Sequence, residues 1–376
     1  MKKILICIDS LRGGGAEKVL TDLLNKIASK YEITLFLIFN DGLHKENLPA
    51  NIKVKYLVNN RNALLQKNKK VGAILEKAIS IMFRNVPPNI LYRIFVRNSY
   101  EVEIAFLEGK STKLISGSNQ LSKKIAWVHT NLKNHHWTKV LYKNVDEEKK
   151  QYRSFNEIVF VSQDSLEGYL EKFGEENNRK LKVIYNPIDE LNIKDKLKMS
   201  EESYNEFTIC SIGRLGKEKG FDRLLRAHAK LISQGLYHNL IILGDGVEKD
   251  NLIKLCEELK VTKTVKFLGF KKNPYKYIKN ANLFVCSSRT EGYSLVLAEA
   301  MIIGLPVLST ACGGTKEILE NGKYGMVVEN SERGIYQGIQ YLMHNREKIE
   351  YYKSMSEKRS RDFRIDKSIK QITELL

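Results

Sequence analysis

The chain alternates short apolar, β-branched runs with longer amphipathic stretches almost from end to end, and this alternation limits its fold more than any other feature. Continuous apolar runs are typical of parallel strands buried on both faces, and the amphipathic stretches predict the helices that cover them. The pattern occurs twice, which predicts an α/β fold with two doubly wound, Rossmann-like domains facing each other across a cleft. The predicted strands are residues 3–9, 33–39, 102–107, 125–128, 157–161 and 182–184, then 207–212, 239–243, 265–268, 283–286, 306–308 and 326–328.

A break in this pattern predicts the domain boundary. Asn186, Pro187 and Asp189 are turn residues, and the polar segment from Glu190 to Glu206 has no apolar period. A length of 376 residues also suits about two domains. We therefore predict a first domain at 1–188, a second at 189–360, and a C-terminal helix at 361–376 that packs back on the first domain.

The strong positive charge of the chain indicates which kinds of molecule it can bind. The sequence has 62 Lys and Arg against 44 Asp and Glu, a formal net charge of +18 that attracts phosphate-bearing molecules. Nucleic acid, anionic lipid and diphosphate ligands all fit this charge. No RNA-binding signature or recognition helix with interleaved aromatics is evident, so nucleic acid is disfavoured as a partner.

Other sequence features bear on localisation and metal binding. No stretch reaches the roughly 18 to 20 apolar residues that a spanning helix needs, and the first apolar run, Ile4 to Ile8, is too short for the core of a signal peptide. We expect a cytoplasmic protein. The five cysteines form no C-x-x-C pair, so we expect reduced structural thiols and no zinc.

A basic, apolar segment runs from Asn62 to Ser99 and mixes isoleucine, leucine and phenylalanine with many lysines and arginines. A surface of this kind can lie on anionic lipid headgroups. Its apolar side can equally pack on its own domain while the lysines face water. The sequence leaves both interpretations open.

The strongest motif spans residues 287–300, where a predicted strand ends at Cys286, a turn contains Glu291 and Gly292, and a helix begins near Ser294. A helix start offers unpaired N–H groups and a positive dipole, so it can hold a diphosphate. Ionised glutamate accepts hydrogen bonds only, which suits it to sugar hydroxyls. We assign Glu291 to hydroxyls of the transferred sugar and Glu299 to the ribose. Without the strand, turn and helix around them, two such glutamates would be interpreted as a charge that caps the helix start and a residue on its solvated face.

Two cations follow another predicted strand. Arg214 and Lys219 lie in the segment 211–221, at the carboxyl edge of the sheet where open α/β domains bind ligands. Fixed cations there can neutralise the charge on a departing diphosphate. In so basic a chain they can also be ordinary surface residues.

Three further candidates belong to the first half of the chain. The glycines at 13–15 follow the first strand and let backbone N–H groups approach a ligand, although Lys18 breaks the dinucleotide pattern G-x-G-x-x-G and disfavours NAD. His129 ends a predicted strand, where it can hydrogen bond the donor sugar or serve only the structure. Glu108, which ends another strand, is a candidate for the acceptor pocket.

In their order along the chain, these motifs resemble glycosyltransferase family 4, the retaining enzymes with the two-domain GT-B fold that build bacterial surface polysaccharides. Each motif is weak alone, but the ordered set is specific and covers nearly the whole chain. The motifs are Gly13–Gly15, Trp127–His129, Val161–Ser162, Asn186–Asp189, Gly213–Leu215 with Lys219–Gly220, Gly244–Gly246, Leu268–Phe270 and Glu291–Glu299.

The resemblance implies an N-terminal acceptor-binding domain and a C-terminal domain for a nucleotide diphosphate sugar, with UDP as the commonest nucleotide. It implies transfer with retention, in which the leaving phosphate takes the acceptor proton, and no metal or other cofactor. His129, Arg214, Lys219 and Glu291 would act at the reacting centre. The implied donor-binding residues are Gly14, Gly15, Gly213, Arg214, Lys219, Gly244, Phe270, Glu291, Gly292, Tyr293, Ser294, Leu295 and Glu299.

The acceptor is the least defined part, because residues 41–99 match nothing in the family pattern. A glycan or lipid-linked acceptor is expected, with association at the inner face of the cytoplasmic membrane if the basic segment binds lipid. Two alternatives stay open: a nucleotide-sugar 2-epimerase on the same fold, and a non-catalytic scaffold that binds sugar nucleotides or a membrane. Neither the donor sugar nor the oligomeric state can be inferred from the sequence.

Overall fold

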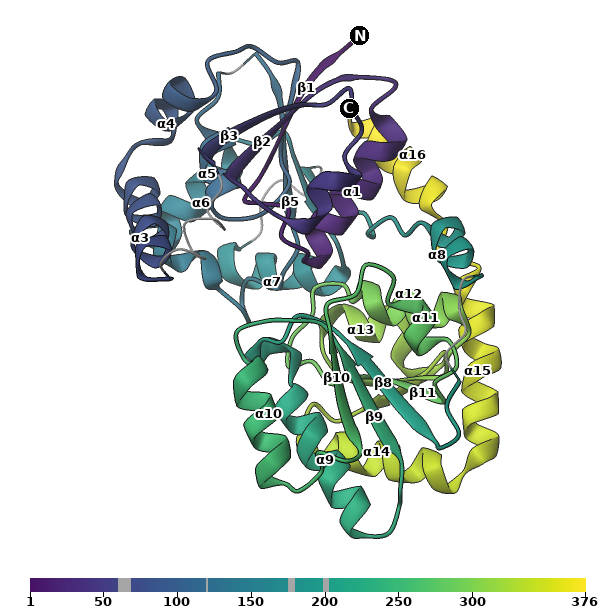
Figure 1. The fold of residues 1–376 in the computed structure, drawn as a ribbon. Helices are drawn as coiled ribbons and strands as arrows, with labels where there is room; N and C mark the ends of the chain where they lie inside the picture. Colours follow the sequence, from purple (N-terminus) through teal and green to yellow (C-terminus); the bar gives the residue numbers. More distant parts are fainter. Residues whose placement is uncertain (60–68, 120, 175–179, 199–202) are drawn as a thin grey trace. The chain divides into compact units, whose positions relative to one another are not determined.

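The computed structural model describes residues 1–59, 69–119, 121–174, 180–198 and 203–376, and the chain forms two compact units (Figure 1). Unit 1 comprises Met1–Pro187 together with Asp366–Leu376, and unit 2 comprises Ile188–Ile365. The chain thus leaves unit 1 after Pro187 and returns to it with its last helix. Leu64 and Leu65 of the basic, apolar segment lie outside the described residues.

Unit 1 is built on a seven-stranded sheet in the order β3-β2-β1-β4-β5-β6-β7, in which every described pairing is parallel. The order switches direction between β1 and β4, which is where open sheets of this type bind ligands. The strands are β1 (Lys3–Ile8), β2 (Glu32–Asn40), β3 (Lys53–Asn59), β4 (Val102–Ala105), β5 (Lys123–Val128), β6 (Glu157–Phe160) and β7 (Leu181–Val183).

Helices cover this sheet and bury its apolar runs, and one hydrophobic core lies between the sheet and the helices. Two helices begin at side-chain caps: Asn144 accepts from the backbone of Glu147, and Ser162 forms a capping box with Ser165. The helices are α1 (Gly15–Ile27), α3 (Lys69–Asn85), α4 (Pro88–Phe95), α5 (Lys110–Ser116), α6 (Val145–Arg153), α7 (Gln163–Phe173) and α16 (Ile365–Leu375), with 3-10 turns η1 (Leu43–Asn47) and η2 (Trp137–Leu141).

Unit 2 has a six-stranded parallel sheet in the order β10-β9-β8-β11-β12-β13, and its switch point lies between β8 and β11. A separate hydrophobic core lies under its helices. The strands are β8 (Thr208–Ile212), β9 (Asn239–Leu243), β10 (Val265–Gly269), β11 (Leu283–Cys286), β12 (Val307–Thr310) and β13 (Met326–Val328). The helices are α8 (Glu190–Leu197), α9 (Phe221–Ser233), α10 (Lys249–Glu258), α11 (Tyr275–Ile278), α12 (Leu295–Ile303), α13 (Gly313–Ile318), α14 (Glu332–His344) and α15 (Arg346–Ser360), with 3-10 turns η4 (Lys217–Lys219) and η5 (Glu320–Gly322).

These two sheets confirm the predicted α/β fold with two doubly wound halves. Each predicted strand coincides with a strand of the structure, and β3 is an addition. It pairs with β2 at the edge of the sheet and is largely exposed, so it carries lysines in place of a continuous apolar run. Within the described residues, no helix combines the length and the apolar character needed to cross a membrane.

Candidate functional site

The polar residues predicted for chemistry in unit 2 follow β8 and β11, the neighbouring strands at the switch point of its sheet; both strands are labelled in Figure 1. The loop after β8 carries Arg214 and Lys219, and the loop after β11 leads through Glu291 to helix α12. Because neighbouring parallel strands end at the same edge, the two loops meet there. We call this meeting point the β8–β11 site.

Lys219 and Glu291 form an ion pair at the β8–β11 site. The Lys219 Nζ atom lies 2.6 Å from Glu291 Oε1, and Ser288 Oγ donates to the same oxygen at 2.7 Å. Burial alone would lower the pKa of Lys219, but the charge of Glu291 and its hydrogen bond outweigh burial and raise that pKa. Lys219 therefore stays cationic near neutral pH, beside an acceptor-only carboxylate.

Arg214 lies on the same loop but is far more exposed. Its Nη2 atom is 2.6 Å from Glu218 Oε1, and 69% of its side chain is accessible to solvent. Burial raises the pKa of Glu218, while the hydrogen bond and charge of Arg214 lower it by more. An exposed pair of this kind contributes only about 0 to 1 kcal/mol, so the guanidinium can leave Glu218 for an anionic ligand at little cost.

A second ion pair fastens the two loops together. Arg289 binds Asp222 in a bidentate manner, with both nitrogen to oxygen distances at 2.7 Å. The Arg289 Nη1 atom also donates to the carbonyl of Lys217 at 2.8 Å, and its backbone N–H donates to the carbonyl of Glu218 at 2.7 Å. The segment that ends in Lys219 is thus held against the segment that carries Glu291.

Glycines let the loops after β8, β9 and β10 lie close together. Gly244 has φ +137°, and a Cβ atom there would lie 1.9 Å from the carbonyl oxygen of Gly213. The backbone N–H of Gly244 donates to the carbonyl of Gly269 at 2.9 Å. Phe270, one of the implied donor-binding residues, follows directly and is 43% exposed.

Helix α12 begins just beyond the Glu291 turn. Ser294 at its N-cap and Leu295 in its first turn are buried, and Glu299 is also buried, at 4% exposure. Gly292 and Tyr293 lie on the turn and are partly exposed. The carbonyl of Gly292 would lie 2.1 Å from a Cβ atom on Gly314, so the start of α13 also packs tightly against this turn.

In unit 1, the predicted glycine loop lies at the carboxyl end of β1. Gly13 has φ +118°, a backbone conformation that favours glycine. Gly14 is the N-cap of α1, and Gly15 is the first residue of that helix. The loop therefore presents backbone groups at a helix start, on the β1 side of the switch point.

The structure brings Glu108 and His129 together at the ends of the neighbouring strands β4 and β5. Glu108 is fully buried and accepts hydrogen bonds from the backbone of His129 at 3.0 Å and from Thr130 Oγ1 at 2.7 Å, as well as from Trp137 Nε1 at 3.2 Å. Glu108 thus positions the His129 segment, and its predicted contact with an acceptor stays a prediction.

His129 is partly exposed, but its Nε2 atom is buried and has no hydrogen-bond partner among the described residues. Burial lowers the pKa of His129, and the charge of Glu108 with a hydrogen bond to the Phe106 backbone offsets part of that effect. The imidazole is therefore neutral near pH 7.

The sequence analysis missed several residues at these edges. Asp9 directly follows β1 and lies 3.0 Å from Lys110 Nζ, at the start of α5, so the unit 1 switch point has its own ion pair. Asp9 directly follows an apolar run and was detectable as a candidate. Ser288 and the Asp222–Arg289 pair carried no signal, because their partners are 3 and 67 positions away and only the fold shows the contacts.

Comparisons with known proteins identify the class to which the chain is similar. Residues 192–360 match the family "Glycosyl transferases group 1". The chain is 29% identical over 368 residues to the N-acetylgalactosamine-N,N'-diacetylbacillosaminyl-diphospho-undecaprenol 4-alpha-N-acetylgalactosaminyltransferase of Campylobacter jejuni, covering 96% of each chain. It is also 28% identical over 153 residues to the capsular polysaccharide biosynthesis glycosyltransferase CapM of Staphylococcus aureus, 39% of this chain and 40% of CapM.

Solved structures show the same fold along the whole chain. The Anabaena protein HepE in complex with UDP and glucose has a TM-score of 0.76 at 21% identity, covering 100% of this chain and 99% of HepE. The S. aureus protein TarM in a complex that contains UDP has a TM-score of 0.74 at 13% identity, with coverage of 100% and 99%.

The fold, the ordered motifs and these matches define one class: the chain is a glycosyltransferase with the GT-B fold. Its second unit carries the group 1 domain, and the predicted resemblance to family 4 is confirmed.

Proposed function

We propose that this enzyme is a retaining transferase that moves a hexose or N-acetylhexosamine from a nucleotide diphosphate sugar, with UDP as the nucleotide. The Lys219–Glu291 pair carries the proposal, because it sets a fixed cation beside a fixed hydroxyl acceptor 2.6 Å away. A sugar diphosphate presents the complementary groups, an anionic diphosphate and sugar hydroxyls, next to one another. No bound metal ion is needed where two cations face the diphosphate.

The residues of this arrangement can assist the transfer reaction. The acceptor hydroxyl attacks the anomeric carbon, the bond to the diphosphate oxygen breaks, and the departing phosphate takes the hydroxyl proton. Lys219 and the exposed Arg214 neutralise the charge that builds on the diphosphate. Glu291 orients the sugar, and Glu299 accepts from the ribose. The free Nε2 of His129 serves as a hydrogen-bond partner for the donor sugar.

We propose a lipid-linked or polysaccharide glycan as the acceptor. The Campylobacter relative is named for transfer to a diphospho-undecaprenol-linked sugar, and CapM is named for capsular polysaccharide biosynthesis. The basic helices α3 and α4 fit this view, since such an acceptor is anchored in a membrane and carries negative charge. The enzyme then works in the cytoplasm, at the inner face of the cytoplasmic membrane.

The proposal is tested by incubating the enzyme with UDP-sugars and a diphosphate-linked acceptor in the presence of a chelator. Proton NMR of the product reads its anomeric configuration. Transfer with the donor's configuration supports the full proposal. An inverted product would exclude retention, a requirement for metal would exclude the metal-independent step, and conversion of the donor to its 2-epimer without an acceptor would favour the epimerase.

A further inference from the structure

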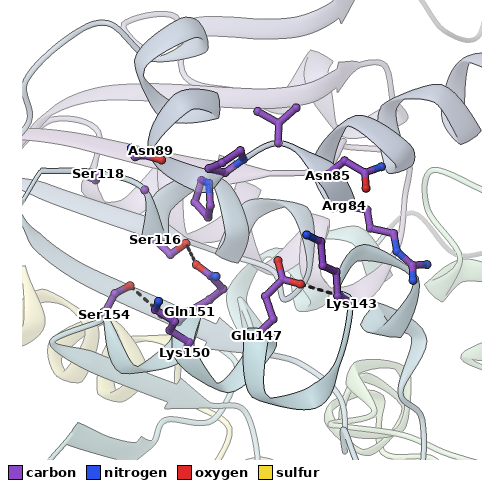
Figure 2. Close-up of a pocket in the computed structure, with 14 residues that line it drawn as sticks. Arg84, Asn85, Asn89, Ser116, Ser118, Lys143, Glu147, Lys150, Gln151 and Ser154 are labelled. Atoms are coloured by element: carbon purple, nitrogen blue, oxygen red, sulfur yellow. Dashed lines mark hydrogen bonds between the residues drawn. The ribbon is translucent and has the colours of Figure 1, made fainter.

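A cavity of about 530 Å³ lies on the helical face of unit 1, between the end of α3, the start of α4, the end of α5 and helix α6. Its volume is within the range of about 300 to 1,000 Å³ typical of small-ligand sites. It is lined by the ends of α5 and α6 that lead into the amino ends of β5 and β6, so it is separate from the strand ends that carry His129 and Glu108. Figure 2 shows its polar side chains, and the proposed chemistry does not use them.

The cavity carries an excess of positive charge. Arg84, Lys143 and Lys150 line it, against one carboxylate, that of Glu147. Glu147 forms an ion pair with the buried Lys113, whose Nζ lies 2.8 Å from Glu147 Oε1. Glu147 also accepts a hydrogen bond from the backbone N–H of Lys143 at 2.6 Å. Within the described ranges, the three lining cations have no side-chain hydrogen bond or ion pair. Three cations therefore line the cavity against one carboxylate, whose charge also acts on Lys143.

Neutral polar groups complete the lining. Gln151 is 9% exposed, and its Oε1 atom accepts from Ser116 Oγ at 2.5 Å. That bond fixes the amide, and the Gln151 nitrogen has no partner in the part of the chain that the structure describes. A fixed N–H donor beside an excess of cations is suited to the oxygens of a phosphate ester.

Exposed apolar side chains lie on α3 and α4, the two helices whose neighbouring ends line the cavity. Ile81 on α3 is 51% exposed and lies one turn before Arg84, and Ile90 on α4 is 44% exposed. Ile74 and Ile94 extend these two exposed faces, at 66% and 48%. Across residues 69–97 the sequence has a single acidic residue, Glu76, which lies 3.8 Å from Arg12. Large exposed apolar side chains beside cations match the two parts of an anionic phospholipid.

We propose that this cavity binds a phosphate ester through Arg84, Lys143 and Lys150, and that its source is the headgroup of an anionic phospholipid in a bilayer on which Ile81 and Ile90 rest. The site deepens the membrane contact of the proposed function and rests on it for the lipid source. The basic composition indicated only a general attraction to anionic lipid, and the cavity adds a defined pocket for one headgroup. The anchor would hold unit 1 on the membrane that contains the acceptor.

The test measures binding of the full chain to phosphatidylglycerol and phosphatidylcholine vesicles at low salt, without any nucleotide sugar. The double variant Lys143→Gln/Lys150→Gln removes cavity charge, and Lys263→Gln/Lys266→Gln removes the same charge from exposed positions of unit 2. We expect the cavity variant to bind phosphatidylglycerol vesicles about tenfold more weakly than the control variant. Equal binding by the two variants would overturn the proposal.

A second arm separates the two sources of phosphate. Ile81→Ser/Ile90→Ser should lose vesicle binding while it still binds soluble glycerol 1-phosphate in a titration followed by NMR. If the native chain binds glycerol 1-phosphate and no vesicle, the phosphate site stands and the lipid source is wrong. Sugar transfer to a soluble acceptor is measured separately, so failure of the membrane site and failure of the proposed reaction are distinguishable.

Discussion

At the scale of single residues, the chemistry proposed for unit 2 depends on Lys219 and Glu291, which are 72 positions apart in sequence and 2.6 Å apart in space. Neither side chain is fully accessible, since 23% of Lys219 and 9% of Glu291 is exposed. Both charges therefore act in surroundings that contain less water than the surface, where an electrostatic interaction with a ligand is stronger.

Replacing Glu291 with glutamine should lower kcat by at least about 100-fold, because the sugar loses a charged acceptor in the transition state. Thermal stability should change little, since glutamine still accepts from Ser288. The control is Glu258→Gln, an exposed glutamate on α10. Steady-state kinetics and a melting curve check this. A kcat within a few-fold of the native value would remove Glu291 from the reacting centre.

A buried histidine pair predicts how stability depends on pH. His228 Nδ1 lies 2.8 Å from His238 Nε2, and burial with the neighbouring His238 lowers the pKa of His228 from 6.5 to about 3. The unfolded chain takes up protons near pH 6.5 while the folded chain does not. The contribution of neutral His228 to the free energy of unfolding is complete above pH 6.5. It is lost on acidification toward pH 3, by about 1.4 kcal/mol per pH unit.

Urea unfolding followed by circular dichroism between pH 7.5 and 5 measures this slope. His228→Gln should flatten it, because glutamine does not titrate. An identical slope in the variant would assign the acid sensitivity to other groups.

At the scale of elements, the β8–β11 site is made of loops that glycines and two ion pairs hold together. Gly244→Ala would place a Cβ atom 1.9 Å from the carbonyl of Gly213, so we expect a loss of about 3 kcal/mol or more and weaker donor binding. Gly235→Ala is the matched control. Gly235 has φ +80° with open space around it, so an alanine there meets only the backbone strain of a positive φ, about 1 kcal/mol. Equal losses in urea unfolding would exclude the close approach as the cause.

The Asp222–Arg289 pair tests whether the loops must be locked for catalysis. Arg289→Met should raise KM for the donor and lower kcat, because Lys219 would lose its fixed position. The swap Asp222→Arg/Arg289→Asp should recover part of both parameters if the pair acts as a fastener. Kinetics of the single and double variants decide this, and purely additive losses would rule out a coupled role.

The elements also show what a sequence can predict. Twelve apolar runs marked twelve strands, because parallel strands buried on both faces leave a continuous signal. Strand β3 was missed because its edge position lets Lys53 and Lys55 face water. The positions of Lys219 and Glu291 at a sheet edge followed from their places just after predicted strands. The burial of Glu108 under three donors could not be predicted, since its donors come from later segments.

At the scale of the whole molecule, the last helix makes unit 1 depend on the end of the chain. Ile372 on α16 is 1% exposed, and Lys2 Nζ donates to the carbonyl of Leu376 at 2.6 Å. Ile372→Ala should destabilise unit 1 by about 3 kcal/mol. Both tryptophans, Trp127 and Trp137, belong to unit 1, so their fluorescence reports its unfolding. Lys370→Ala, an exposed change on the same helix, is the control, and equal effects would contradict a packing role for α16.

The most direct test of the central claim is thermal stabilisation by UDP- and GDP-sugars, with and without a chelator, in the native chain and in Lys219→Ala. A ligand that binds only the folded state raises its stability. The account predicts a rise with a UDP-sugar that the chelator does not change and that Lys219→Ala largely removes. No rise with any nucleotide sugar, or an equal rise in Lys219→Ala, would contradict a donor site at Lys219 and Glu291.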